Sequence, residues 1–242
     1  MGLAKEKLRL ERIMEDTKDS YVNGKKKGHP TEILKARDQL VRTRTQLINH
    51  VRSVVKVTGA RLPQTSAAAF ITRATADIPA EMRVAVDPLV RIITDLNRQI
   101  READHTIGAL IRDVYPVAER LQQPSGVGPI TALAFVLLVD DPTRFVNSRD
   151  VGAYFGLVPR LDESSDSQPQ LRISKCGDAL GRRLLVTAAH YILGPFGPEC
   201  DLRRHGQRIA ERGGKNAKKR GVVAVARKLA VLLHRLWVSE RP

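Results

Sequence analysis

One apolar pattern in the middle of the chain constrains the fold more than any other feature. Between residues 82 and 114, apolar side chains recur at alternating steps of four and three residues: Met82, Val86, Leu89, Ile93, Leu96, Ile100, Ala103, Ile107, Leu110 and Val114. This seven-residue repeat is typical of a long helix that packs one face against another helix. Pro88 falls near its start, so we expect the regular part of the helix to begin there.

A second seven-residue repeat precedes the first. Apolar pairs recur at Ile33/Leu34, Leu40/Val41, Leu47/Ile48 and Val54/Val55. The pattern predicts a long helix with Thr31 as its N-cap, ended by Gly59 and Pro63. The two helices are expected to pair as an antiparallel coiled-coil hairpin. So long a seam favours a homo-oligomer, and an intramolecular bundle is the alternative.

The remaining segments predict a mainly α fold, in which we expect three parts. Residues 1–30 are a charged tail and linker, residues 31–119 a coiled-coil region, and residues 120–242 a compact helical domain. In that domain we expect helices over 133–141, 145–159, 178–193, 200–212 and 215–237. Asn147 or Ser148 is the expected cap of the second of these.

Charge indicates the class of partner. The net charge is +15, and between Arg203 and Arg235 eleven Lys and Arg face one acid, Glu211. A basic excess concentrated in one part of a chain favours a polyanion partner such as DNA. The two cysteines, Cys176 and Cys200, make neither a disulfide framework nor a zinc pattern. With no signal sequence and no membrane-length apolar run, we expect a cytoplasmic protein without membrane contacts.

A glycine turn is the first candidate for chemistry. Residues 125–132 read SGVGPITA, and the turn comes directly before an apolar run. Backbone N–H groups of such a turn suit a phosphate oxygen, as in a helix-hairpin-helix element that grips nucleic-acid backbone. The alternative is a plain turn between helices. The candidate binding residues here are Gly126, Val127, Gly128 and Thr131.

A serine-rich stretch is the second candidate. Residues 161–178 read LDESSDSQPQLRISKCGD, with Ser164, Ser165 and Ser167 close together. A serine hydroxyl needs a base or a metal to become a nucleophile, and no histidine lies nearby in the sequence. From chemistry alone, a solvated loop is the commoner explanation. Basic residues follow it and are candidate phosphate contacts: Arg172, Lys175, Arg182, Arg183, Lys215, Lys218, Lys219 and Arg220.

Three segments together resemble a known family. They are GVGPITALAFVLLVDDPTRFVNSRDVGAYFGLVPR, then QLRISKCGDALGRRLLVTAAHYILGPFGP, then GGKNAKKRGVVAVARKLAVLLHRLW. In this order they resemble the C-terminal half of insertion-sequence transposases of family one-ten, which are DEDD-type, bridge-RNA-guided DNA recombinases. The resemblance covers roughly residues 31–242.

The resemblance implies a mechanism. Members of the family carry an N-terminal RuvC-like domain that binds Mg²⁺, then a coiled coil, and then a transposase domain. The transposase domain contains a helix-hairpin-helix and a nucleophilic serine. That serine comes nine residues before the isoleucine of an Ile-Ser-Lys-x-Gly motif, so Ile173 selects Ser164. The family usually has glycine next, where this chain has Ser165, so both hydroxyls remain candidates. The implied partners are DNA and a structured guide RNA.

The chain also departs from the resemblance. Only about thirty residues precede the coiled coil, and they show no strand-rich pattern, so we expect a truncated copy or a split protein that lacks the Mg²⁺-binding half. The expected function is a DNA transposase that attacks a phosphodiester through Ser164. The alternative is a non-catalytic nucleic-acid-binding remnant or architectural protein.

Overall fold

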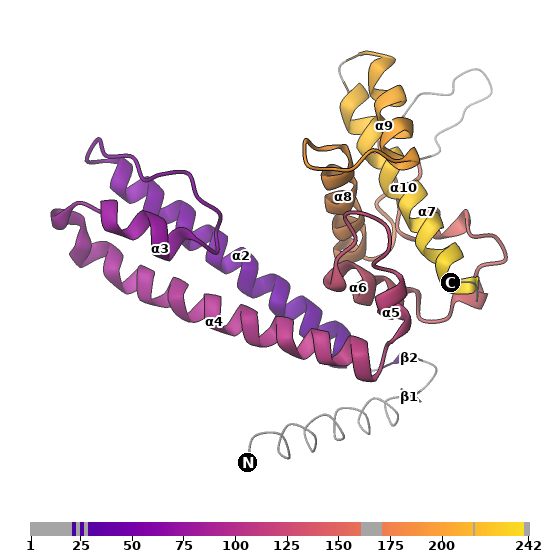
Figure 1. Ribbon diagram of the computed structural model, residues 1–242, viewed down its shortest axis with the longest axis horizontal. Helices are drawn as coiled ribbons and strands as arrows, with labels where there is room; N and C mark the ends of the chain where they lie inside the picture. The colour runs from indigo at the N-terminus through magenta and orange to yellow at the C-terminus, as the bar shows by residue number, and fades with distance from the viewer. Residues whose placement is uncertain (1–20, 23–24, 27–28, 161–170, 215, 240–242) are drawn as a thin grey trace. The chain divides into compact units, whose positions relative to one another are not determined.

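The computed structural model describes residues 21–22, 25–26, 29–160, 171–214 and 216–239, and these are mainly helical, as predicted (Figure 1). The chain divides into two compact units, residues 1–108 and 109–242. The long helices are α2 (His29–Lys56), α4 (Arg83–Asp113), α8 (Ala179–Leu193) and α10 (Ala217–Val238). The shorter ones are α3 (Phe70–Ala74), α5 (Val117–Arg120), α6 (Pro129–Val139), α7 (Asp150–Tyr154), α9 (Asp201–Glu211) and the 3₁₀ turns η1 (Thr75–Asp77), η2 (Ala80–Met82) and η3 (Pro142–Arg144).

An antiparallel pair of long helices forms the first unit. Arg37 Nε donates to Asp104 Oδ1 at 2.6 Å, and Arg44 Nη1 donates to Asn97 Oδ1 at 2.8 Å. Seven residues forward on α2 therefore correspond to seven residues back on α4. The two contacts are thus one heptad apart on each helix, as in a coiled coil. Every position of the apolar repeat that lies within α4 is buried or half-buried.

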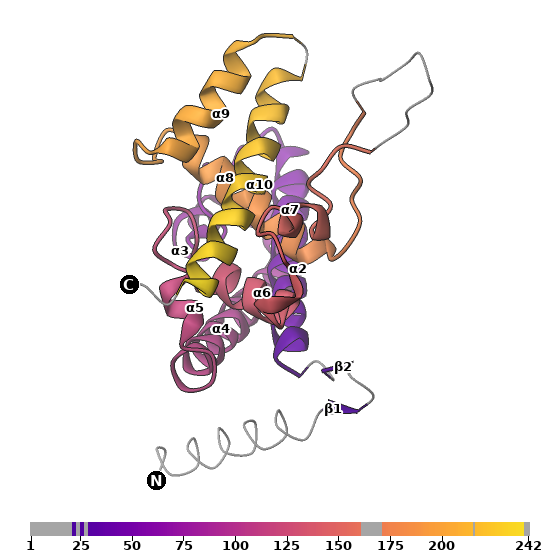
Figure 2. The same cartoon turned by 90° about the vertical axis from the view of Figure 1, so that its right-hand side faces the viewer.

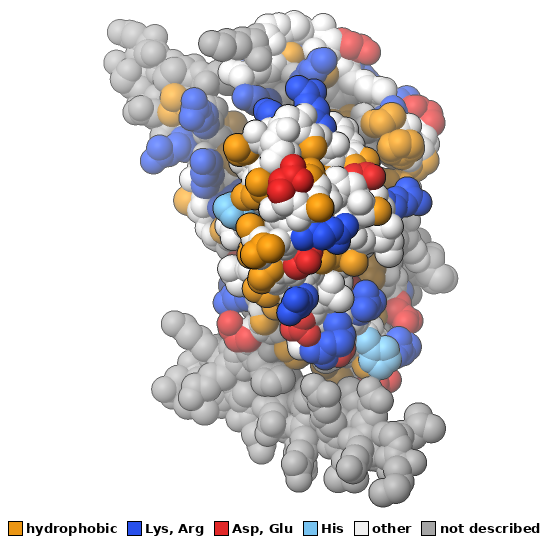
Figure 3. Space-filling view, turned by 90° about the vertical axis from the view of Figure 1, so that its left-hand side faces the viewer, with side chains coloured by type: hydrophobic (Ala, Val, Ile, Leu, Met, Phe, Trp, Pro, Cys, Tyr) orange, Lys and Arg blue, Asp and Glu red, His pale blue; other side chains and the backbone are white. Residues whose placement is uncertain are grey.

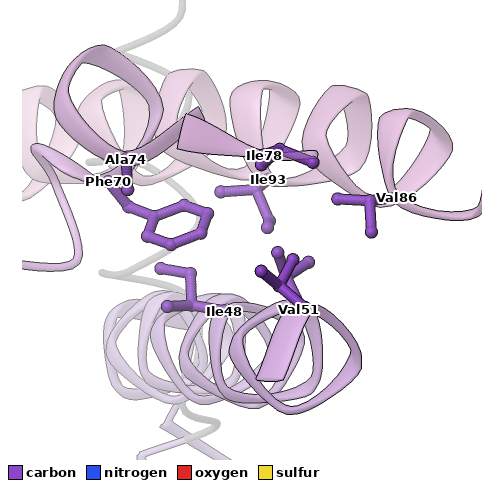
Figure 4. Close-up of a cluster of buried hydrophobic side chains, with 8 residues drawn as sticks. Ile48, Val51, Phe70, Ala74, Ile78, Val86 and Ile93 are labelled. Atoms are coloured by element: carbon purple, nitrogen blue, oxygen red, sulfur yellow. The ribbon is translucent and has the colours of Figure 1, made fainter. Parts of the chain in front are cut away.

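An apolar cluster fills the tip of the helix pair. Val51, Val55, Phe70 and Val86 are fully buried there, together with Ile48, Ala74, Ile78 and Ile93. Figure 4 shows labelled side chains from α2, α3, α4 and the residue after η1, Ile78, converging on one another. The short helix α3 thus packs its buried side chains, Phe70 and Ala74, against α2 and α4.

A polar layer lies beside this apolar seam. Asn97 is buried, and Arg44 Nε is buried without a hydrogen-bond partner among the described residues. Burial, and then the neighbouring Arg37 charge, lower the pKa of Arg44, while Asp104 acts in the opposite direction. A polar pair in an apolar seam costs stability but fixes register.

Three expectations for the first unit were wrong. Helix α2 begins at His29, so Thr31 lies inside its first turn instead of capping it. Helix α4 runs through Pro88, because only one backbone hydrogen bond is lost near its N-terminal end. Before α2, the segment taken as a linker holds two short paired strands, β1 (Tyr21–Val22) and β2 (Lys25–Lys26), which are antiparallel with Tyr21 opposite Lys26.

Among the described residues, helices α5 to α10, the turn η3 and the last turn of α4 belong to the second unit. Helices α8, α9 and α10 pack on one another, and α9 and α10 form an antiparallel pair (Figure 2). Their backbones touch at two glycines, since a Cβ on Gly221 would lie 2.7 Å from the carbonyl oxygen of Gly206. Phe135 of α6 stacks on Phe155 with ring centroids 5.6 Å apart, which joins α6 to the end of α7.

The predicted cap of α7 was also wrong. Helix α7 starts at Asp150, and its N-cap Arg149 makes no side-chain hydrogen bond. The helix ends at Tyr154 and is therefore shorter than the expected helix over 145–159. Ser148 has another partner, because its Oγ lies 3.0 Å from His234 Nδ1. The Nε2 atom of the same buried ring lies 2.9 Å from the carbonyl oxygen of Pro142. His234 therefore fastens the chain before α7 to α10.

The described surface carries both signs of charge. Figure 3 shows acidic and basic side chains interspersed on one face. Within the described residues, no helix is long and apolar enough to cross a membrane.

Candidate nucleic-acid interface

Two chain segments pair on either side of residues 161–170, and we call this pairing the neck (residues 156–160 and 171–177). Pro159 and Ile173 form an antiparallel bridge. Three backbone hydrogen bonds flank it, from Arg160 N to Arg172 O (2.9 Å), from Ser174 N to Val158 O (2.8 Å) and from Lys175 N to Gly156 O (3.2 Å). The neck therefore brings both ends of the serine-bearing segment together.

Two glycines allow the strands of the neck to approach. Gly156 has φ +64°, and a Cβ built on it would lie 2.4 Å from the carbonyl oxygen of Cys176. Gly177 has φ +73°, and its Cβ would lie 2.0 Å from the carbonyl oxygen of Tyr154. Lys175 itself is left-handed, with φ +58°. The Ile-Ser-Lys-x-Gly motif thus has a structural explanation, because its residues supply the bridge, the reversal and the close contact.

Helix α8 begins directly after the neck and supports it. Asp178 is its N-cap, and Oδ1 of this residue accepts a hydrogen bond from Gly181 N at 2.8 Å. Arg182, one turn further on, donates through Nη1 to Cys176 O at 2.9 Å and to Phe155 O at 3.3 Å. One guanidinium nitrogen therefore links both sides of the neck, and Arg182 has a positioning role besides the phosphate contact expected from sequence.

Several of the expected cations are grouped at the neck. Arg172 and Lys175 are exposed on it, and Arg183 is half-buried on α8 next to Arg182. Sequence reasoning missed Arg160, which is exposed on the opposite strand of the neck, although its position directly before the serine stretch was a usable signal. Ser164 and Ser165 lie outside the described residues.

The glycine turn lies between α5 and α6. Gly126 has φ +84° and faces α8, because its Cβ would lie 2.9 Å from Ala188 O and 3.1 Å from Tyr191 Cδ1. Gly128 is the N-cap of α6 with an ordinary φ of −95°, and its Cβ would meet no protein atom within 4 Å. Gly126 is thus required by packing, whereas nothing in the packing requires a glycine at position 128.

The other two residues predicted at this turn face inward. The Val127 side chain is buried, and its N–H donates to Pro124 O at 3.1 Å. Thr131 is buried against an apolar lining that includes Phe135 and Phe155. Both positions therefore serve the core of the second unit, and the part of the turn open to a ligand is Gly128 with the first turn of α6.

The last group of predicted cations lies at the start of α10. Lys218 and Lys219 are exposed in its first turn, which has no acid, and its N-cap Asn216 makes no side-chain cap. Arg220 donates through Nη2 to Gly213 O at 3.1 Å and so holds the turn after α9. Cations at a helix N-terminus oppose the helix dipole, so an anion bound there would relieve the repulsion. Lys215 lies outside the described residues.

Comparison with known proteins identifies the family. Residues 118–200 match the model of the transposase IS116/IS110/IS902 family. A transposase for insertion sequence element IS1111A from Coxiella burnetii is 31% identical over 215 residues, covering 86% of this chain and 58% of the relative. A probable family 20 transposase from Pseudomonas aeruginosa is 30% identical over 214 residues, covering 85% of this chain and 62% of the relative.

The chain belongs to the IS116/IS110/IS902 transposase family. A third relative, a transposase for insertion sequence element IS1328 from Yersinia enterocolitica, is 32% identical over 162 residues, or 64% of this chain and 47% of the relative. The chain therefore spans about three-fifths of the length of the first two relatives.

The segment that matches the family model contains both candidate features and the helix that connects them. Residues 118–200 contain the glycine turn, the neck and α8. Gly126 packs near the end of α8, and Arg182 near its start holds the neck, so this transposase domain uses one helix to position both features. Sequence reasoning identified each feature separately but missed that α8 joins them.

Among the described residues, no group of three or more His, Cys, Asp or Glu could hold a metal ion.

Proposed function

We propose that this chain supplies the nucleophile and the nucleic-acid contacts of a DNA transposition reaction, with Ser164 attacking a DNA phosphodiester. The support is the combination of family membership and the neck. The family match covers the serine segment, and the described neck pairs the residues on either side of it through the bridge from Pro159 to Ile173. A neck lined by Arg160, Arg172 and Lys175 offers positive charge to a phosphate at the base of the segment.

The proposed step is a transesterification. A bond forms between Ser164 Oγ and the phosphorus atom, while the bond from phosphorus to one deoxyribose oxygen breaks. The proton leaves the serine hydroxyl, and the deoxyribose oxygen takes one up as it departs, so atoms and charge balance. The product is a covalent protein–DNA ester that a second hydroxyl can resolve. Ser165 is the alternative nucleophile.

The glycine turn is proposed as a helix-hairpin-helix contact to the phosphate backbone. Its open position, Gly128, admits close approach of a phosphate to the first turn of α6, which includes no acid. Contacts of this kind position a duplex without reading its sequence. The cations at the start of α10 would extend the same interface.

The partners proposed for this chain are DNA, a structured guide RNA and a second copy bound through the helix pair of the first unit. Exposed apolar side chains fit an association of helical hairpins: Val84 and Ile92 on α4, and Val57 directly after α2. Mg²⁺, which the resemblance implies, finds no suitable set of ligands among the described residues.

A strand-transfer assay tests this function. The full chain is combined with a separately supplied RuvC-like, Mg²⁺-binding half of the family, DNA carrying insertion-sequence ends, the element's RNA and Mg²⁺, and recombinant junctions are counted. Ser164→Ala is expected to abolish junctions while it leaves DNA affinity unchanged, and Ser167→Ala serves as the matched control. Undiminished junctions with Ser164→Ala and with Ser165→Ala would refute a serine mechanism. Full DNA binding without junctions in the wild type would favour the non-catalytic alternative.

A further inference from the structure

A line of basic side chains runs along the paired helices α9 and α10, outside the segment that matches the family model. His205 and Arg208 lie on one face of α9, and Arg212, the C-cap residue of the helix, follows Arg208 by a further four residues. Lys228 joins them from α10, which packs on α9 along the contact of Gly206 with Gly221. We call these four residues the His205 cluster.

The His205 ring reports how close these charges are. It is half-buried, and its pKa is lowered first by burial and then by the charges of Lys228, Arg208 and Arg212. No acid contributes to that shift. Each of the three cations is therefore close enough to His205 to disfavour the protonated ring.

In the described part of the chain, the cations of the cluster have no acidic partner in an ion pair, although α9 itself carries Asp201 and Glu211. Two other arginines show the contrast. Arg204, also on α9, pairs with Asp201 and with Glu199, and Arg98 on α4 pairs with Asp95 and Glu102. By contrast, none of the three cluster cations forms an ion pair with an acid among the described residues, although all three are exposed: Arg208, Arg212 and Lys228. Their charge is left for an external anion.

The arrangement of the cluster fits an extended anion. Arg208 and Arg212 are one helical turn apart, about 6 Å along the axis, and Lys228 continues the line on the neighbouring helix. A single inorganic phosphate would meet only part of such a line, whereas a nucleic-acid strand presents charge at regular intervals. The line also leads through Arg212 to the turn before Lys218 and Lys219.

We propose that the His205 cluster is a second binding surface for the phosphate backbone of a nucleic acid, and that His205 makes this binding depend on pH. The inference rests on the proposed nucleic-acid function but concerns residues other than those at the neck and the glycine turn. A polyanion offsets the repulsion from the three cations and so favours protonated His205. Binding is therefore accompanied by proton uptake. Affinity rises as pH falls through the pKa of His205 in the complex, and levels off below its pKa in the free protein.

The first test follows His205 by NMR in the full chain, with and without a single-stranded DNA oligonucleotide. The ring resonance is assigned by its loss in His205→Gln. The oligonucleotide is expected to raise the titration midpoint of His205 by about half a unit or more. An unchanged midpoint at saturating oligonucleotide would overturn the proposal.

The second test compares two charge-matched triple variants. One carries Arg208→Gln, Arg212→Gln and Lys228→Gln. The control carries Arg91→Gln, Arg101→Gln and Arg112→Gln, which removes the same charge from exposed positions on α4. Each lost phosphate contact lowers the slope of log affinity against log salt by roughly 0.7 on a single strand, so the cluster variant should lose about two from the slope. Equal losses in the control would show that only net charge matters and would reject the site.

Two further arms separate the possible failures. If the wild-type chain binds no nucleic acid, the proposed function fails together with this inference. If it binds and Arg172→Gln with Lys175→Gln weakens binding but the cluster variant does not, only this inference fails. Binding of polyglutamate or of anionic lipid vesicles as tight as that of DNA, with the same dependence on the cluster, would overturn the assignment to nucleic acid.

Discussion

Gly177 lies so close to Tyr154 that a Cβ on the glycine would stand 2.0 Å from the tyrosine carbonyl oxygen. This contact fixes where the returning strand of the neck meets the end of α7, immediately before α8 begins. It couples the geometry of the neck to the packing of the second unit. The last glycine of the Ile-Ser-Lys-x-Gly motif is therefore a structural requirement.

Gly177→Ala should destabilise the second unit in two ways. The substitution places an L side chain at φ +73° and forces a backbone contact apart. Strain of this kind costs about 1–3 kcal/mol at a single residue, and the clash adds to it. Urea denaturation followed by circular dichroism measures the loss. Gly213→Ala is the matched control, because its φ is +76° but its Cβ would meet nothing within 4 Å. Equal losses in both variants would show that the contact with Tyr154 contributes nothing.

The two glycines of the turn before α6 should respond differently to alanine. Gly126→Ala is expected to lower stability, because its Cβ would lie 2.9 Å from Ala188 O. Gly128→Ala should leave stability unchanged and weaken DNA binding by on the order of tenfold, about 1.4 kcal/mol, if a phosphate approaches the backbone there. Thermal unfolding and fluorescence anisotropy distinguish the two effects. DNA binding by Gly128→Ala equal to that of the wild type would remove the turn from the interface.

The polar pair of Arg44 and Asn97 should contribute less to the stability of the helix pair than to its register and oligomeric state. Asn97→Leu removes the acceptor of Arg44 and leaves a partly buried guanidinium without it, at a cost of about 1 kcal/mol. Adding Arg44→Leu should recover that loss or exceed it, since an apolar pair suits the seam. The double variant is expected to form mixed oligomers, visible by light scattering. A double variant less stable than Asn97→Leu, or one with unchanged oligomeric state, would contradict this role.

The sequence predicted the helices well because their cause is local. The heptad spacing from Val86 to Leu110 leaves only one face of α4 to bury, and the structure buries it. The errors have nonlocal causes. Ser148 is a good helix cap by residue type, but His234, far along the chain, binds its hydroxyl instead. Thr131 follows a turn suited to phosphate, yet α6 rotates its side chain into the core.

The candidate site was predictable in its parts but not in its assembly. The sequence places the basic residue Arg182 shortly after the serine stretch, and the family resemblance selected Ser164 as the nucleophile. No local pattern could show that Arg182 hydrogen-bonds two carbonyl groups of the neck, because Phe155 and Cys176 meet only in the folded chain. The same holds for Lys228, which comes near His205 through the packing of α9 on α10.

The central claim is that Ser164 forms a covalent bond with DNA, and peptide mapping tests it most directly. The strand-transfer reaction is stopped with denaturant, DNA is digested to a nucleotide remnant, and trypsin is added. Cleavage after Arg160 and Arg172 gives one peptide, residues 161–172, that holds Ser164, Ser165 and Ser167. The account predicts a nucleotide on this peptide at Ser164, retained in Ser165→Ala and Ser167→Ala and lost in Ser164→Ala. A nucleotide on any other residue, its persistence in Ser164→Ala, or an unmodified wild-type peptide in a reaction that yields junctions would contradict it.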